Sequence, residues 1–190
     1  MTSLTQSVQR QLSQHIQSGD KVIDATAGNG WDTLFLATQV GNEGKVYAFD
    51  IQAEAIESSQ KKLEEKQLLQ RVDLFHCSHD LMLEKIPSDA INTISTIMFN
   101  LGYLPGSDKS IITQTESTLL ALDASLALLK PDGRLSVVVY PGHSGGDTEA
   151  QAVMQWSKHL NNNLNNNWQL EVTETPGPVA LMVSGSTRYG

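Results

Sequence analysis

The segment KVIDATAGNGWD, residues 21–32, indicates how this chain folds. Its first half is a short apolar run that ends on Asp24, and its second half carries Gly28 and Gly30, one residue apart. From Trp31 onward, apolar residues recur at helical spacing. The stretch therefore predicts a buried strand, a tight turn and the start of a helix, a unit that builds parallel sheets.

Strand-like and helix-like segments alternate along the rest of the chain. Apolar and β-branched runs predict further strands over residues 45–50, 72–77, 91–100 and 134–140. We expect the helix before residue 134 to begin near Ile112, to include Leu129 and to be stopped by Pro131-Asp132-Gly133. Two adjacent strands around Pro176-Gly177-Pro178 end the pattern. It predicts an α/β fold: a doubly wound, mostly parallel seven-stranded sheet with a terminal antiparallel hairpin.

Size and composition narrow the class of protein. With 190 residues, the chain is expected to form one domain over 1–190. It has a single cysteine, a polar N-terminal segment without a secretory signal, and no apolar run long enough for a membrane span. We therefore expect a cytoplasmic protein without disulfides. The net charge of −8 argues against a protein that coats long nucleic acids, and leaves room for a local RNA contact.

The glycine turn indicates a nucleoside ligand. A dinucleotide site would require a third glycine, where this chain has Thr33. An acid at the strand end, small residues and a G-x-G turn fit S-adenosylmethionine better, and Asp24, Thr26, Gly28 and Gly30 supply them. Asp24 is expected to attract the ligand's ammonium group directly or through water. The turn alone is also compatible with an ordinary strand–helix connection.

The next two strand ends carry polar residues. Asp50 follows Gly30 by 20 residues, where an acid accepts hydrogen bonds from ribose hydroxyls in both NAD and S-adenosylmethionine sites. Ser78, His79 and Asp80 end the third strand, which normally lies beside an adenine. A helix N-cap by Ser78 or Asp80 is the alternative interpretation.

The fourth strand is followed by NLGYLPGSDK, residues 100–109. Its Asn-x-x-Tyr resembles the Asn-Pro-Pro-Tyr loop of amino-methyltransferases, with Leu101-Gly102 in place of the two prolines. Methyl transfer moves positive charge from a sulfonium to an attacking amine, so the site must offer acceptors. The carbonyl of Asn100 supplies one, and Tyr103 offers a face on which a base can stack. A plain strand–helix loop is the alternative.

The fifth strand is followed by YPGHSGG, residues 140–146. At an ordinary pKa near 6.5, His143 would accept a proton from a substrate ammonium. A locally bonded loop histidine is the alternative.

Taken together, DATAGNGWDTLFLA, FDIQ, FNLGYLPGSDK and YPGHSGG resemble the signature blocks of the rRNA methylase family of small bacterial methyltransferases. Members of that family act on tRNA as 5-aminomethyl-(2-thio)uridine methyltransferases. The resemblance implies a class I S-adenosylmethionine-dependent fold, methylation of the aminomethyl group on the wobble uridine in the tRNA anticodon region, and a homodimer. It also implies cofactor contacts by Asn29, Asp50, Gln52, Ser78 and His79.

The hypothesis from sequence is therefore a tRNA amine methyltransferase. Asn100, Tyr103 and His143 are its candidate catalytic residues. Asp108, Lys109 and Tyr140 are candidate substrate contacts, with Lys109 meeting a phosphate and Asp108 orienting it or capping a helix. No metal ligands are assigned. The alternatives are methylation of rRNA or of a small-molecule amine, an NAD-dependent oxidoreductase, and a non-catalytic nucleoside-binding module.

Overall fold

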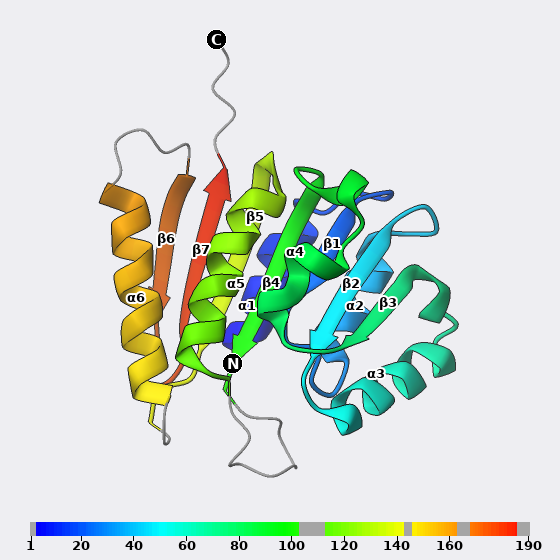
Figure 1. The fold of residues 1–190 in the computed structure, drawn as a ribbon, viewed down its shortest axis with the longest axis horizontal. Helices are drawn as coiled ribbons and strands as arrows, with labels where there is room; N and C mark the ends of the chain where they lie inside the picture. The colour runs from blue at the N-terminus through cyan, green and yellow to red at the C-terminus, as the bar shows by residue number, and fades with distance from the viewer. Residues whose placement is uncertain (1–2, 103–112, 143–145, 163–167, 186–190) are drawn as a thin grey trace.

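The computed structural model describes residues 3–102, 113–142, 146–162 and 168–185 (Figure 1). The strands in these segments are β1 (Lys21–Asp24), β2 (Lys45–Asp50), β3 (Val72–His76), β4 (Ile94–Leu101), β5 (Leu129–Val139), β6 (Trp168–Glu174) and β7 (Val179–Gly185). The α-helices are α1 (Leu4–Ser13), α2 (Trp31–Gln39), α3 (Ala53–Glu65), α4 (Met82–Lys85), α5 (Thr115–Leu128) and α6 (Gly146–Asn162). Short 3₁₀ turns are η1 (Leu69–Arg71), η2 (His79–Leu81) and η3 (Ser88–Ala90).

All seven strands form one sheet in the order β3-β2-β1-β4-β5-β7-β6. The first five strands pair in parallel, whereas β7 lies antiparallel between β5 and the edge strand β6. The predicted mostly parallel sheet with an antiparallel terminal hairpin is confirmed. The chain proceeds outward from β1 in one direction and from β4 in the other. Ligands of such sheets bind at this switch point, outside the carboxyl ends of the strands.

Helices cover both faces of the sheet (Figure 1). Because side chains alternate along a strand, Val22 packs with Leu12 and Leu36 of α1 and α2, while its neighbour Ile23 packs in a second core with Leu122 of α5. The helices α1, α2 and α3 thus cover one face, and α4, α5 and α6 cover the other. The two cores fix the carboxyl ends of the parallel strands along one edge of the sheet. The polar residues predicted for the site follow these strand ends.

The predicted start of β4 and the predicted boundary between α5 and β5 are wrong, for local reasons. The strand predicted over residues 91–100 begins at Ile94, because Asn92 takes a left-handed conformation with φ 60° and the chain turns there. The helix α5 ends at Leu128 before Pro131 is reached, and β5 begins at Leu129. The proline and its neighbours are accommodated where the pairing of β4 with β5 shifts register.

None of the helices in the described segments combines the length and apolar character that a membrane span needs.

Candidate functional site

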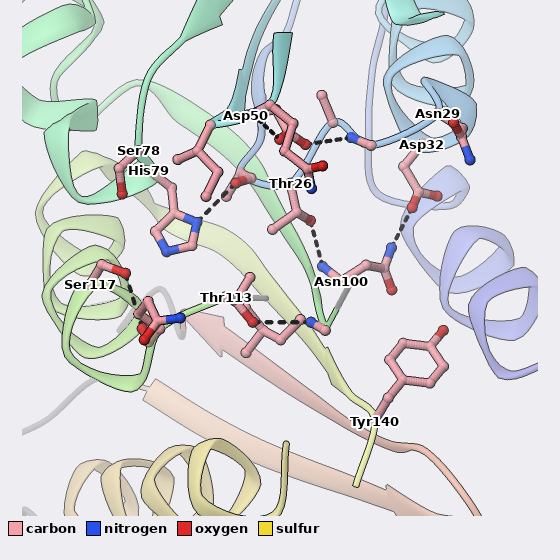
Figure 2. A pocket seen from close by; sticks show the side chains of 18 of the residues that line it. Thr26, Asn29, Asp32, Asp50, Ser78, His79, Asn100, Thr113, Ser117 and Tyr140 are labelled. Atoms are coloured by element: carbon pink, nitrogen blue, oxygen red, sulfur yellow. Dashed lines mark hydrogen bonds between the residues drawn. The ribbon is translucent and has the colours of Figure 1, made fainter. Parts of the chain in front are cut away.

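A cavity of about 680 Å³ lies at the carboxyl ends of the first five strands (Figure 2). Its walls come from the segments that follow these strands, from α1 and from the start of α5, and include residues 25–29, 50–52, 77–79, 100–102, 113–114 and 140–142. Nine predicted site residues line it: Thr26, Gly28, Asn29, Asp50, Gln52, Ser78, His79, Asn100 and Tyr140. Asp24 and Gly30 lie near the cavity without lining it. Tyr103, Asp108, Lys109 and His143 fall outside the described residues, and their roles stay predictions.

The glycine turn is held from two sides. Gly30 has φ 79°, and a Cβ atom there would lie 2.7 Å from the Cα of Ser59 on α3, so only glycine fits. The Ser59 hydroxyl donates to the Gly28 carbonyl (3.1 Å), and the Gly28 N–H donates to Oδ2 of Asp50 (2.8 Å). These contacts fix the turn against α3 and the end of β2.

Asp24 lies beneath this turn, with 1% of its surface exposed. Its carboxylate accepts hydrogen bonds from the Thr33 hydroxyl (2.6 Å) and the Thr26 N–H (3.2 Å). Burial, together with the nearby carboxylate of Asp32, raises the pKa of Asp24 to about 7. Its hydrogen bonds to Thr26 and Thr33 support a role in shaping the turn. The expectation that Asp24 attracts the ligand's ammonium group, directly or through water, stays a prediction.

Asp50 fixes the glycine turn and also lines the cavity. Besides the bond from Gly28, its Oδ1 accepts from the Gln52 N–H (2.9 Å). Each carboxylate oxygen can accept further hydrogen bonds. The carboxylate is thus oriented by the backbone and retains acceptor capacity toward a ligand with hydroxyl groups.

His79 presents a second acceptor. Its Nδ1 donates to the Ala25 carbonyl (3.1 Å), so the neutral ring has its lone pair on Nε2. The ring is 7% exposed, its Nε2 is buried with no hydrogen-bond partner among the described residues, and its edge packs against Phe99. Burial lowers the pKa of His79, which favours the neutral form.

Asn100 lies at the end of β4 and is fixed at two points. Its backbone N–H donates to the Thr26 hydroxyl (2.7 Å), and its side-chain nitrogen donates to Asp32. Figure 2 shows the amide nitrogen turned toward Asp32 and the amide oxygen turned away from it. That oxygen, Oδ1, is buried and has no partner among the described residues.

Asp32, in the first turn of α2, was not identified from sequence. It lines the cavity and also accepts a hydrogen bond from Gln9 of α1 (2.6 Å). Burial raises the pKa of Asp32, and the bonds from Gln9 and Asn100 partly offset this. The only sequence signal was an acid two residues after the second glycine, in a helix first turn that favours negative charge.

Helix α1 forms an unexpected wall of the cavity. Thr5 and Gln9 both line it, and the Thr5 hydroxyl lies 3.2 Å from the Tyr140 hydroxyl at the end of β5. The sequence predicted this helix from its apolar spacing, which gives no information on what its polar face contacts. Tyr140 is thus held to α1 at the rim.

The end of β4 is also anchored to α6. The Gly102 N–H donates to the Thr113 hydroxyl (3.0 Å), which donates to the buried carboxylate of Glu149 (2.5 Å). Thr118 of α5 donates to the other oxygen of Glu149 (2.7 Å). Sequence reasoning missed this cluster, because its members are brought together only by the packing of two helices.

The charged side chains that line the cavity within the described residues are all of one sign. Among its described lining residues, Asp32 and Asp50 are acidic and none is lysine or arginine. No group of three or more metal-ligating side chains is found in the described segments. The lining therefore favours cationic ligands and groups that donate hydrogen bonds.

Comparison with known proteins supports this interpretation. Residues 46–184 match the model of a family described as "Putative rRNA methylase". A solved structure of that description from Clostridium thermocellum is 35% identical, with a TM-score of 0.88 and 97% of each chain covered. A Streptococcus mutans structure solved in complex with SAH, the demethylated form of S-adenosylmethionine, is 31% identical, with a TM-score of 0.83 over 97% of this chain and 98% of that one.

One curated relative carries a more specific name. The Arabidopsis thaliana protein named tRNA (mnm(5)s(2)U34)-methyltransferase, chloroplastic, is 47% identical over 155 residues, 77% of this chain and 56% of the relative. The chain thus spans about half the length of the curated relatives it matches. The family match covers most of the chain and agrees with the fold and the cavity, so the chain belongs to the rRNA methylase family.

Proposed function

We propose that this chain is an S-adenosylmethionine-dependent methyltransferase that methylates the aminomethyl group of the tRNA wobble uridine. The product would be 5-methylaminomethyl-(2-thio)uridine. The observation that carries the proposal is the buried side-chain carbonyl oxygen of Asn100, a residue that lines the acidic cavity; this oxygen has no partner among the described residues. Such an acceptor suits a donor that gains positive charge, as an amine does during methylation.

The residues of the cavity fit S-adenosylmethionine. Asp50 offers oriented oxygens for ribose hydroxyls, and the unpartnered Nε2 of His79 suits the exocyclic amine of an adenine. No lysine or arginine is among the described lining residues, which suits a sulfonium and an ammonium. When bound, this cofactor supplies a reactive methyl group, so the protein needs mainly to position the acceptor and exclude water.

The same features disfavour NAD. Thr33 replaces the third glycine of the dinucleotide turn, and its hydroxyl is committed to Asp24. The described lining of the cavity offers no lysine or arginine to a pyrophosphate.

On the substrate side, the chain's own groups hold the amine. Asn100 would accept a hydrogen bond from it and stabilise the charge that develops there. Tyr103 would stack on the uracil, His143 would take the proton, and Tyr140, Asp108 and Lys109 would contact the nucleotide. These roles rest on the family resemblance of their motifs and on the position of Asn100 and Tyr140 in the cavity.

An RNA partner also needs a cationic contact, since the chain carries a net charge of −8. The Lys62 ammonium lies 3.7 Å from the ring centroid of Trp31, an exposed residue that lines the cavity. An aromatic ring with a cation suits an unstacked base and its phosphate. We place the substrate contact in the tRNA anticodon region, and the enzyme in the cytoplasm as a homodimer.

The proposal is tested with purified protein, S-adenosylmethionine and tRNA that carries 5-aminomethyl-(2-thio)uridine, with nucleosides analysed by mass spectrometry. We expect one methyl group to be added to that nucleoside. Unmodified tRNA, rRNA and small amines serve as competing substrates. Transfer to rRNA or to a small amine alone would contradict the proposal.

The cofactor is tested separately by thermal unfolding. A ligand at 100 times its dissociation constant adds about 2.7 kcal/mol to stability. S-adenosylmethionine and its demethylated product should raise the melting temperature, and NAD should not. A shift with NAD alone would contradict the assignment.

A further inference from the structure

The carboxylate of Asp32 receives two side-chain amides from opposite sides of the cavity wall. Gln9 donates to Oδ1 from α1 (2.6 Å), and Asn100 donates to Oδ2 from the end of β4. The three residues come from segments 23 and 68 residues apart in sequence. Their meeting at the cavity is therefore a product of the fold and not of local chain geometry.

An ionised carboxylate decides how the Asn100 amide is oriented. A primary amide has a donor end and an acceptor end of nearly equal size, so it can pack either way round. A carboxylate only accepts, so it selects the orientation in which the nitrogen faces Asp32. The oxygen is then left buried and without a partner in the described residues. Leaving an acceptor unpaired costs stability, which indicates that the pairing with Asp32 outweighs this cost.

The hydrogen bond from Gln9 favours the ionised form of Asp32. Burial raises the pKa of Asp32, while the hydrogen bonds from Gln9 and Asn100 oppose that rise. A protonated Asp32 could donate a hydrogen bond to the Asn100 oxygen, and the amide could then flip to the opposite orientation. Gln9 thus acts on Asn100 only through Asp32.

We propose that Asp32 is a positioning residue that holds the Asn100 carbonyl oxygen toward the substrate amine. This rests on the proposed function, and it gives a role to a residue that was not among the candidate site residues predicted from sequence. Asp32 need not touch the substrate. Its effect on the reaction should therefore require the side chain of Asn100.

A double-mutant cycle on the rate of methyl transfer tests this dependence. Asp32→Ala, Asn100→Ala and the double variant are compared in single-turnover assays on aminomethyluridine tRNA. Asp32→Ala should lower the rate about 10²–10³-fold, comparable with loss of one positioned electrostatic partner. In the Asn100→Ala background, the same change should lower the rate less than about threefold, since the group it positions is absent.

One further measurement and two further variants separate positioning from other roles. Affinity for the demethylated cofactor, measured by calorimetry, should stay within about threefold of the wild type, by the same reasoning of independent sites. Asp89→Ala removes an exposed aspartate paired with Lys21, and serves as the matched control with unchanged rate. If Asp32→Ala does not fold, Asp32→Asn replaces it in the cycle, because the amide keeps the shape and loses the selectivity for a donor.

The outcomes are distinct. Losses that multiply in the double variant, or a collapse of cofactor affinity in a folded Asp32 variant, would overturn the inference alone. Absence of transfer by the wild-type protein would overturn the proposed function and this inference with it. A rate that depends on Asp32 only when Asn100 is present supports both.

Discussion

The two halves of the cavity are built differently. On the β1–β3 side, carboxylates fix the backbone: Asp50 accepts the N–H groups of Gly28 and Gln52. On the β4–β5 side, side chains from distant segments bind one another, as Asn100 does with Asp32 and Tyr140 with Thr5. The first half is a rigid cradle suited to an invariant cofactor. The second is a set of oriented side chains suited to chemistry on a substrate.

The sharpest test of this division is Asn100→Ala. If Asn100 accepts the charge-gaining amine, its loss should lower the single-turnover rate about 10²–10³-fold. Affinity for the demethylated cofactor should change only a few-fold, because Asp50 and His79 are untouched. An Asn100→Ala protein that turns over normally, or that fails only because it no longer binds cofactor, would erase the distinction between the two halves.

The converse test is Asp50→Ala. Charge-assisted hydrogen bonds contribute about 1.5–3 kcal/mol each, so cofactor affinity measured by calorimetry should fall at least about tenfold. Part of this loss would come from the Gly28 turn, which loses the acceptor for its N–H. At saturating cofactor, the transfer rate should recover toward that of the wild type. Unchanged affinity in a folded variant would mean that the end of β2 is not the ribose site.

A third test concerns Asp24, which lies beneath the glycine turn, and uses the pH dependence of the free energy of unfolding. Folded Asp24, with its pKa near 7, holds a proton that an unfolded aspartate releases near pH 4. The native chain binds the extra proton between these values, so this residue makes stability fall as pH rises from about 4 to about 7. Asp24→Asn removes this loss, and should raise the free energy of unfolding at pH 8 by about 1 kcal/mol or more.

Denaturant unfolding of the wild type and Asp24→Asn at pH 5 and pH 8 measures that difference. The gain of the variant should be larger at pH 8. An equal or smaller gain at pH 8 than at pH 5 would show that the pKa of Asp24 is not raised in the folded protein.

The parts of the site that depend on local chain geometry could be predicted from the sequence. Gly28, Gly30 and Asp50 followed from spacing, because strand, turn and helix are set by local geometry and the acid lies one βα unit further on. Asp32 did not, although it stands inside the quoted stretch. Its importance depends on Asn100, which the pairing of β1 with β4 brings within reach.

The predicted helix and strand boundaries were wrong where helix-stopping residues in the sequence competed with strand pairing. Pro131 and Gly133 are strong helix-stopping residues, yet α5 ends before them, and β5 absorbs them at a register shift. Thr5 and Gln9 were likewise unpredictable, because the spacing of Leu4, Val8 and Leu12 specifies which face of α1 is buried and not what the other face meets.

The smallest expected effect belongs to the contact between α1 and the end of β5. The Thr5–Tyr140 hydrogen bond is exposed and neutral, and such bonds contribute about 0.5–1.5 kcal/mol at most. Thr5→Val should therefore change the transfer rate by no more than about tenfold. Kinetics of Thr5→Val and Tyr140→Phe measured side by side check this. A large loss in Thr5→Val alone would assign Thr5 itself to substrate binding and enlarge the substrate half of the cavity.

Nucleoside analysis of cellular tRNA is the most direct test of amine methylation at the wobble uridine. In cells that lack the gene, mass spectrometry should find 5-aminomethyl-(2-thio)uridine accumulated and its methylated form lost. Wild-type protein should restore the methylated nucleoside, and Asn100→Ala should not. A nucleoside profile unchanged by loss of the gene would contradict the account.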